Sequence, residues 1–266
     1  MRRPPKRVLT LLMIAASFSS LRCEPLDALY SSRAIVTGTG ARNREPGFRD
    51  CLTRVLMRVS GDQRLAARPE LERLKAEAGR FVLSFSYRDR LAGKPVHDEQ
   101  GTYDRPHDLT CRYDPPVVDS LLRSLGSRPW LANRPRLAVF LDVERNGVSY
   151  RLSRDNPRDQ AMREAFQASA SPMAMAVAFP GAENEALAAT GSGLPHLSRA
   201  ARAAGADLPL EGRLFWSDPD LGWVATWRLE VDGTAHEWTV RGVNFDEAFR
   251  VAIRGAAQIL SGNGTP

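Results

Sequence analysis

The chain has 266 residues, and 43% of them are hydrophobic, which is enough to build the core of one large domain or two small ones. Its net charge of +6 is concentrated at the start: without the four cations of residues 1–7, the 37 Lys and Arg residues fall to 33 against 31 Asp and Glu. This near balance excludes the strongly basic surface typical of nucleic-acid-binding proteins, so no nucleic-acid partner is expected.

Residues 1–20 are predicted to be a cleavable signal peptide. Four cations precede an apolar run from Val8 to Phe18, and Ser17 and Ser19 supply the small residues of a cleavage site near its end. The run is shorter than the roughly 20 apolar residues that cross a bilayer, and no other stretch approaches that length. We therefore expect export to the periplasm and a mature chain without a transmembrane segment. Lipidation of Cys23 is a weaker alternative, because Arg22 stands where a small residue is usual.

The first half, residues 26–130, is predicted to be an α+β domain. Strands are expected at 28–37, 80–88 and 109–113, and helices at 43–59, 69–79 and 117–125. Within residues 80–88 the alternation places Phe81, Leu83, Phe85 and Tyr87 on one face of a strand. Ser127–Arg136 is the expected joint with the second half.

The second half, residues 136–262, is predicted to be an α/β domain with the order β-α-β-α-β-β-β-α and a mixed sheet. Strands are expected at 137–143, 173–179, 208–216, 222–231 and 234–241, and the first two are expected to be parallel, with crossover helices at 156–169 and 195–204. Asp232-Gly233 predicts a tight hairpin, and Asn244 predicts the N-cap of a last helix. The fold class is thus α/β (α+β), with two small sheet-plus-helix domains.

Two cysteines are predicted to face the core of the first half. Cys51 shares the apolar face of the first long helix, and Cys111 points the same way as Leu109 and Tyr113 in its strand. Exported proteins usually pair such cysteines, so a Cys51–Cys111 disulfide is expected, with two buried free thiols as the alternative.

The sequence contains none of the common catalytic motifs that would assign an activity. The sequence contains no P-loop, GxSxG or HExxH pattern, and we predict no catalytic, cofactor or metal residues. Asp142 and Glu144 share one face at the end of a buried strand, where acid–base chemistry is conceivable. An envelope hydrolase that uses these carboxylates is therefore one alternative function.

Three tryptophans form the most distinctive cluster of the second half. Trp223 and Trp227 fall on one face of their strand, and Trp238 lies across the hairpin from them. They form either a core under the last helix or an exposed platform for a glycan or a partner protein. A glycan- or peptidoglycan-binding module is the second alternative function.

Several segments resemble a known family. They are Arg58-Val59-Ser60-Gly61-Asp62 after a helix, the strand at 81–87, and Trp130 followed by Asn133-Arg134-Pro135. Together they resemble the bacterial exported-protein family called domain of unknown function 2066, whose pattern usually has Thr in place of Ser60. The resemblance implies an uncharacterised envelope protein and brings no catalytic residues. We therefore expect a non-catalytic binding or scaffold protein whose partner is an envelope protein.

Overall fold

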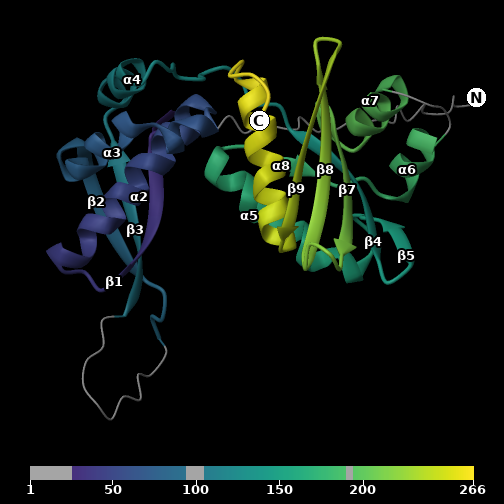
Figure 1. The fold of residues 1–266 in the computed structure, drawn as a ribbon, viewed down its shortest axis with the longest axis horizontal. Helices are drawn as coiled ribbons and strands as arrows, with labels where there is room; N and C mark the ends of the chain where they lie inside the picture. Colours follow the sequence, from purple (N-terminus) through teal and green to yellow (C-terminus); the bar gives the residue numbers. More distant parts are fainter. Residues whose placement is uncertain (1–25, 94–104, 190–193) are drawn as a thin grey trace, which may run out of the picture.

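The computed structural model describes residues 26–93, 105–189 and 194–266. It contains two β-sheets, one in each half of the chain (Figure 1). Helices cover one face of the first sheet and both faces of the second. The predicted mixed α/β class is confirmed. Among the described residues, no helix is both long and apolar enough to cross a membrane. The signal-peptide prediction concerns residues 1–20, which lie outside the described residues.

The first half is a three-stranded antiparallel sheet covered on one face by helices. Its strand order is β1 (Ser31–Thr37), β3 (Pro106–Tyr113), β2 (Val82–Asp89). The helices are α1 (Leu26–Leu29), α2 (Ala41–Ser60), α3 (Pro69–Ala76) and α4 (Pro115–Ser124), with 3-10 turns at Gln63–Ala67 and Ala78–Phe81.

Helix α2 holds this half together. It buries one apolar stripe against the sheet, made of Phe48, Cys51, Leu52, Val55, Leu56 and Val59. Each fully buried Val or Leu in such a stripe stabilises the fold by about 1.5–3 kcal/mol. Gly61 ends the helix in the left-handed conformation, at φ 73°, and its N–H donates to the carbonyl of Met57.

The orientation predicted for Leu83 is wrong. A β-bulge between Val82 and Ser84 adds one residue to β2, so the side chains before and after it no longer alternate in step. As a result Leu83 points outward and is 70% exposed. Phe85 and Tyr87 stay on the helix side, where Phe85 meets Phe48 edge to face at 5.4 Å between ring centroids.

The second half is a mixed six-stranded sheet with the order β5-β4-β7-β8-β9, and β6 pairs with β4 beside β5. Its strands are β4 (Leu137–Arg145), β5 (Val148–Arg151), β6 (Val177–Ala178), β7 (Leu208–Ser217), β8 (Gly222–Val231) and β9 (Thr234–Val243). Strand β4 runs parallel to β6 and β7, and the remaining pairs are antiparallel.

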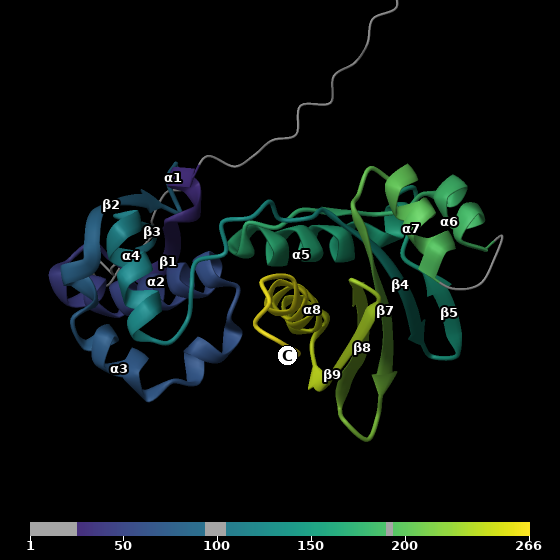
Figure 2. The ribbon, with the colours of Figure 1, turned by 90° about the horizontal axis from the view of Figure 1, so that it is seen from above.

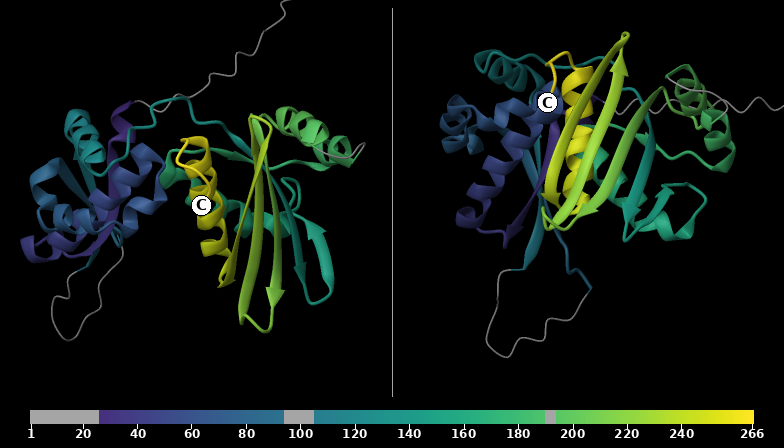
Figure 3. Two further views of the ribbon diagram at one scale, coloured as in Figure 1. Left: turned by 45° about the horizontal axis from the view of Figure 1, so that its top comes forward. Right: turned by 45° about the vertical axis from the view of Figure 1, so that its right-hand side comes forward.

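Helices cover this sheet on both faces. Helices α5 (Gln160–Ala170) and α8 (Phe245–Leu260) lie on the face turned toward the first half, and α6 (Ala182–Ala189) and α7 (Leu194–Ala203) lie on the other (Figure 2). Asn244 caps α8, where its side chain accepts from the N–H of Glu247 at 2.8 Å as predicted. Figure 3 shows α8 standing between the larger sheet and the first half.

The second half differs from the sequence prediction at one expected strand and at two elements that were not expected. The strand expected at 173–179 is only β6, because Pro172 opens a 3-10 turn (Ser171–Met173) and Ala174 takes a left-handed φ of 51°. Helix α6 lies in a stretch for which the sequence predicted no helix or strand. Strand β5 was not predicted; Asn146 and Gly147, both at positive φ, form the tight turn that folds it back on β4.

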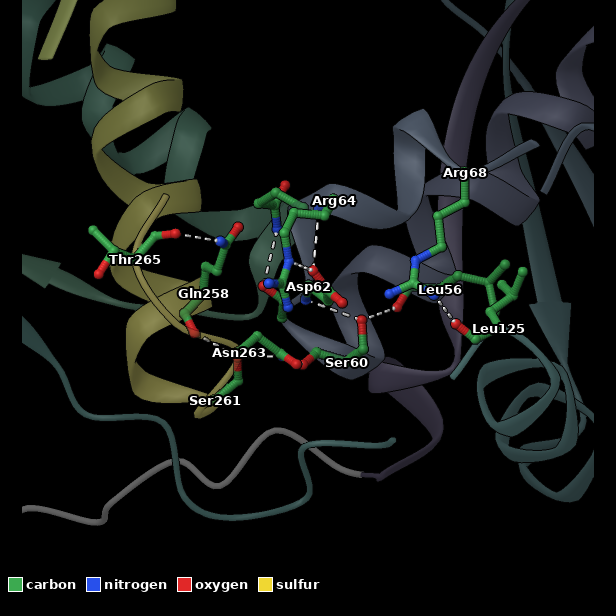
Figure 4. A network of polar contacts seen from close by, with 12 residues as sticks. Leu56, Ser60, Asp62, Arg64, Arg68, Leu125, Gln258, Ser261, Asn263 and Thr265 are labelled. Carbon is green, nitrogen blue, oxygen red and sulfur yellow. Dashed lines mark hydrogen bonds and ion pairs between the residues drawn. The ribbon is translucent and has the colours of Figure 1, made fainter. Parts of the chain in front are cut away.

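The two halves meet where α2 ends (Figure 4). Ser60 Oγ donates to the carbonyl of Leu56 at 2.7 Å and accepts from the N–H of Asp62 at 3.0 Å, which fixes the turn after α2. The segment that follows α8 binds this turn, because Asn263 Nδ2 donates to the Ser60 carbonyl at 3.0 Å. The segment 58–62, which the sequence analysis singled out, is therefore a contact between the halves.

A second tie between the halves comes from Arg134 in the joint. Its guanidinium stacks over Trp130, 4.3 Å from the ring centroid, and donates to the carbonyl of Arg58 at 2.8 Å. It also donates to the carbonyl of Met173. One side chain thus links α2, the joint and the 3-10 turn that follows α5.

Candidate functional site

A groove of about 410 Å³ lies between the halves, along β1. Five successive residues of β1, 31–35, form one wall, and three small residues that follow or end α5 form the opposite one: Ala168, Ser171 and Pro172. Arg54 and Arg58 of α2, with Asp108 and Thr110 of β3, complete the lining. We call this the β1 groove.

The backbone edge of β1 faces this groove. Tyr113 N donates to the Tyr30 carbonyl at 3.0 Å, and Gly38 N donates to the Arg105 carbonyl at 2.8 Å. In an antiparallel pair, hydrogen-bonded residues alternate, so the even residues of β1 bond to β3. The odd residues therefore direct their N–H and C=O groups away from the sheet. Consistent with this, Arg54 Nη1 donates to the carbonyl of Arg33 at 2.9 Å.

The β1 groove is positively charged. Arg33 and Arg54 are exposed and Arg58 is half-buried at its border. The one lining carboxylate, Asp108, is already paired with Arg88 at 2.5 Å and with Arg90 at 3.6 Å. The hydrogen bond from Arg88, with further attraction from Arg88, Arg33 and Arg90, holds the pKa of Asp108 below its usual value although burial opposes this. Asp108 thus stays ionised, in ion pairs with Arg88 and Arg90 and with attraction to Arg33, and the groove keeps the exposed charges of Arg33 and Arg54.

A second groove, of about 350 Å³, lies on the outer face of the larger sheet beside α7. It contains Asp142, one of the two candidate carboxylates. Asp142 accepts two hydrogen bonds from Arg151, at 2.8 and 2.9 Å, and Glu144 pairs with Arg213 at 3.1 Å. Sequence correctly placed both on one face. Each of these two carboxylates is thus already bound to a guanidinium group in this structure.

The three candidate tryptophans form a core and not a surface. Trp223, Trp227 and Trp238 are all buried in the cluster under α8. Trp227 meets Phe166 edge to face at 5.7 Å, and the Trp238 indole donates to the Val251 carbonyl at 3.2 Å. The exposed platform suggested by the sequence is therefore wrong: the shared face exists, but α8 covers it.

Cys51 and Cys111 face each other as buried free thiols, so the expected bridge is not formed in this structure. Cys51 Sγ lies 3.8 Å from the carbonyl oxygens of Ser32 and Leu109, and Ser32 is the cross-strand partner of Cys111. A hydrogen bond to Cys51, together with burial, raises the pKa of the Cys111 thiol far above its usual value. The sequence prediction that both cysteine side chains point into the core of the first half is confirmed.

Sequence reasoning assigned no binding role to the arginines of the β1 groove. Arg54 and Arg58 are four residues apart and so lie on one side of α2, a spacing that is visible in the sequence. Their partner Arg33 lies 21 positions before Arg54, and only the docking of α2 on β1 brings them together. Among the described residues, no group of three or more metal-ligating side chains converges.

Comparison with known proteins matches only the first half. The family described as Domain of unknown function (DUF8605) matches residues 24–131, which contain all of the first sheet and its helices. The resemblance to domain of unknown function 2066 is therefore wrong, because the matching family is a different one. Short segments such as Arg58–Asp62 here serve the packing of the halves, and such segments are weak family markers. No curated protein and no solved structure significantly matches the chain.

Proposed function

We propose that this chain is an exported, non-catalytic binding protein of the bacterial envelope, and that it binds a partner protein in the β1 groove. The proposal is carried by one observation: an edge of β1 that pairs with no other described strand lies in the same groove as three arginines. Hydrogen-bonding backbone and fixed positive charge are features of recognition surfaces.

The ion pairs of the second half also favour binding over catalysis. The carboxylates Asp142 and Glu144 are each engaged by an arginine, and the tryptophan cluster supports α8. Export is supported by the sequence of residues 1–20, with its cations followed by an apolar run. The charge balance of the remaining residues gives no reason to favour nucleic acid as the partner.

Site-specific crosslinking in the cell tests this function. A photo-crosslinking amino acid is placed at Ile35, which lines the groove and is 57% exposed, and at Val148 as a control. Val148 is also apolar and 60% exposed, but it lies in β5, the strand at the far edge of the larger sheet (Figure 1).

We expect an adduct with one envelope protein from position 35 and no such adduct from position 148. Equal adducts from both positions, or none from position 35 in an exported and folded protein, would contradict the proposal. Mass spectrometry of the adduct identifies the partner and the peptide that reaches the groove.

A further inference from the structure

We propose that the free edge of β1 binds an extended, acidic segment of the partner protein by strand addition. This inference rests on the proposed function, and it names both the chemistry of the partner and the way it binds. The added segment becomes a fourth strand of the first sheet, next to β1, in the order partner-β1-β3-β2.

The backbone of β1 is arranged for such an addition. Ser31, Arg33 and Ile35 point their N–H and C=O groups into the groove, because the even residues are used by β3. The bond from Arg54 to the Arg33 carbonyl leaves a second lone pair on that oxygen. Main-chain hydrogen bonds of this kind give affinity in strand addition, and side-chain contacts give specificity.

The opposite wall leaves room for a strand. A neighbouring strand lies about 4.8 Å from β1, and five residues of it span about 16 Å. The wall across the groove consists of Ala168, Ser171 and Pro172, whose side chains are all small and exposed. The groove of about 410 Å³ is therefore open where the backbone of the segment would run.

Charge selects an acidic segment. Successive side chains of a strand point to opposite faces, so those of the segment alternate between two environments. On the helix side they meet Arg54 and Arg58, and on the outer side they meet Arg33 and the exposed Ile35. Asp108 forms ion pairs with Arg88 and Arg90, while the exposed Arg33 and Arg54 line the groove and can meet carboxylates of the partner.

A protein segment fits the groove better than a nucleic acid does. Single-stranded nucleic acids are bound by stacking their bases on aromatic side chains along a basic groove. The described residues that line the β1 groove include no aromatic side chain, whereas they include a strand edge that only a polypeptide can complete.

The test measures binding of labelled peptides to the purified full chain by fluorescence anisotropy. The probe is an octapeptide of alternating glutamate and valine. One control peptide has lysine in place of glutamate, and another keeps the acidic sequence but carries N-methyl groups on alternate amides, which removes the N–H donors of one edge. A single-stranded oligonucleotide serves as a polyanion without a peptide backbone.

Three variants report on the site. Arg33→Glu and Arg54→Glu reverse groove charges, and Arg123→Glu reverses a matched exposed charge on α4. Ile35→Pro removes an N–H that points into the groove, and the pairing with β3 keeps its bonds because residue 35 does not contribute to them. If Ile35→Pro fails to fold, the N-methylated peptide tests the same hydrogen bonds on the unchanged protein.

We expect the acidic peptide to bind and the lysine peptide not to bind. Each groove charge reversal, Ile35→Pro and N-methylation should weaken binding by about tenfold or more, and Arg123→Glu should not. Binding that is insensitive to N-methylation, oligonucleotide binding as tight as that of the peptide, or no peptide binding at all would overturn strand addition. If one of these results is obtained but position 35 still gives its specific crosslink, strand addition is rejected while the proposed binding function is retained.

Discussion

Asn263 Nδ2 donates a hydrogen bond of 3.0 Å to the carbonyl oxygen of Ser60, and so joins the end of α2 to the segment that follows α8. The two residues lie 203 positions apart. Because the β1 groove has one wall from each half, contacts of this kind set its width.

Removal of this bond should weaken the contact between the halves. Asn263→Ala leaves the buried Ser60 carbonyl without this donor, so we expect the free energy of unfolding to fall by about 1 kcal/mol. Urea unfolding measures the change, and Asn133→Ala, at an exposed position in the joint, is the control. Equal stability of the two variants would show that the bond contributes nothing.

Gly61 should tolerate no side chain. Its φ of 73° is left-handed, and a Cβ would lie 2.6 Å from Ser261 Oγ and 2.9 Å from the Ala257 carbonyl. Gly147 has the same φ, but nothing lies within 4 Å of its Cβ position. We expect Gly147→Ala to cost about 1–2 kcal/mol from backbone strain alone, and Gly61→Ala to cost clearly more. Thermal unfolding of both variants measures the two losses of stability, and their difference is the cost of the steric conflict at Gly61. Equal losses would show that a side chain at position 61 does not collide with Ser261.

The facing thiols should bridge in an oxidising compartment. We expect the exported protein to have lost two hydrogen atoms relative to the reduced form, by intact mass spectrometry, through a Cys51–Cys111 disulfide formed by thiol–disulfide exchange. Closing this loop should raise stability by about 4 kcal/mol in the chain-entropy model. Protein made without residues 1–20 in a reducing cytoplasm is the control. Two alkylatable thiols at these positions in the exported, denatured protein would refute the bridge.

Alkaline pH should destabilise the reduced protein. The hydrogen bond that the Cys111 thiol donates to Cys51, together with burial, raises the pKa of Cys111, and burial raises the pKa of Tyr113. These groups stay protonated in the folded state, so the stability they contribute is complete below their unfolded pKa values, about 8.5 for Cys and 10 for Tyr. It is lost as the pH rises beyond them, by about 1.4 kcal/mol per pH unit for each proton.

Urea unfolding at several pH values between 8 and 11 measures this loss. Tyr113→Phe removes one titrating group, so its decline should be shallower than that of the parent chain. An identical slope in the two proteins would show that Tyr113 does not contribute.

Much of the fold was predictable because local periodicity reflects which face of an element is buried. The apolar stripe of α2, the hairpin at Asp232-Gly233 and the capped last helix were all predicted from the sequence and are confirmed. The predictions failed where one residue changes the local geometry. The bulge before Ser84 turned Leu83 outward, and the left-handed Ala174 shortened the strand expected at 173–179.

The sequence by itself determined the two-half α/β architecture and the faces that carry Cys51, Cys111 and the three tryptophans, because each of these follows from the spacing of side chains along one element. Only the tertiary structure decided what lies over those faces. Helix α8 covers the tryptophans, and arginines pair with Asp142 and Glu144. Among the residues that the structure describes, the order β1-β3-β2 leaves the edge of β1 without a neighbouring strand, beside Arg33 and Arg54. Strand order and helix docking depend on contacts between distant segments, and no local pattern along the chain records them.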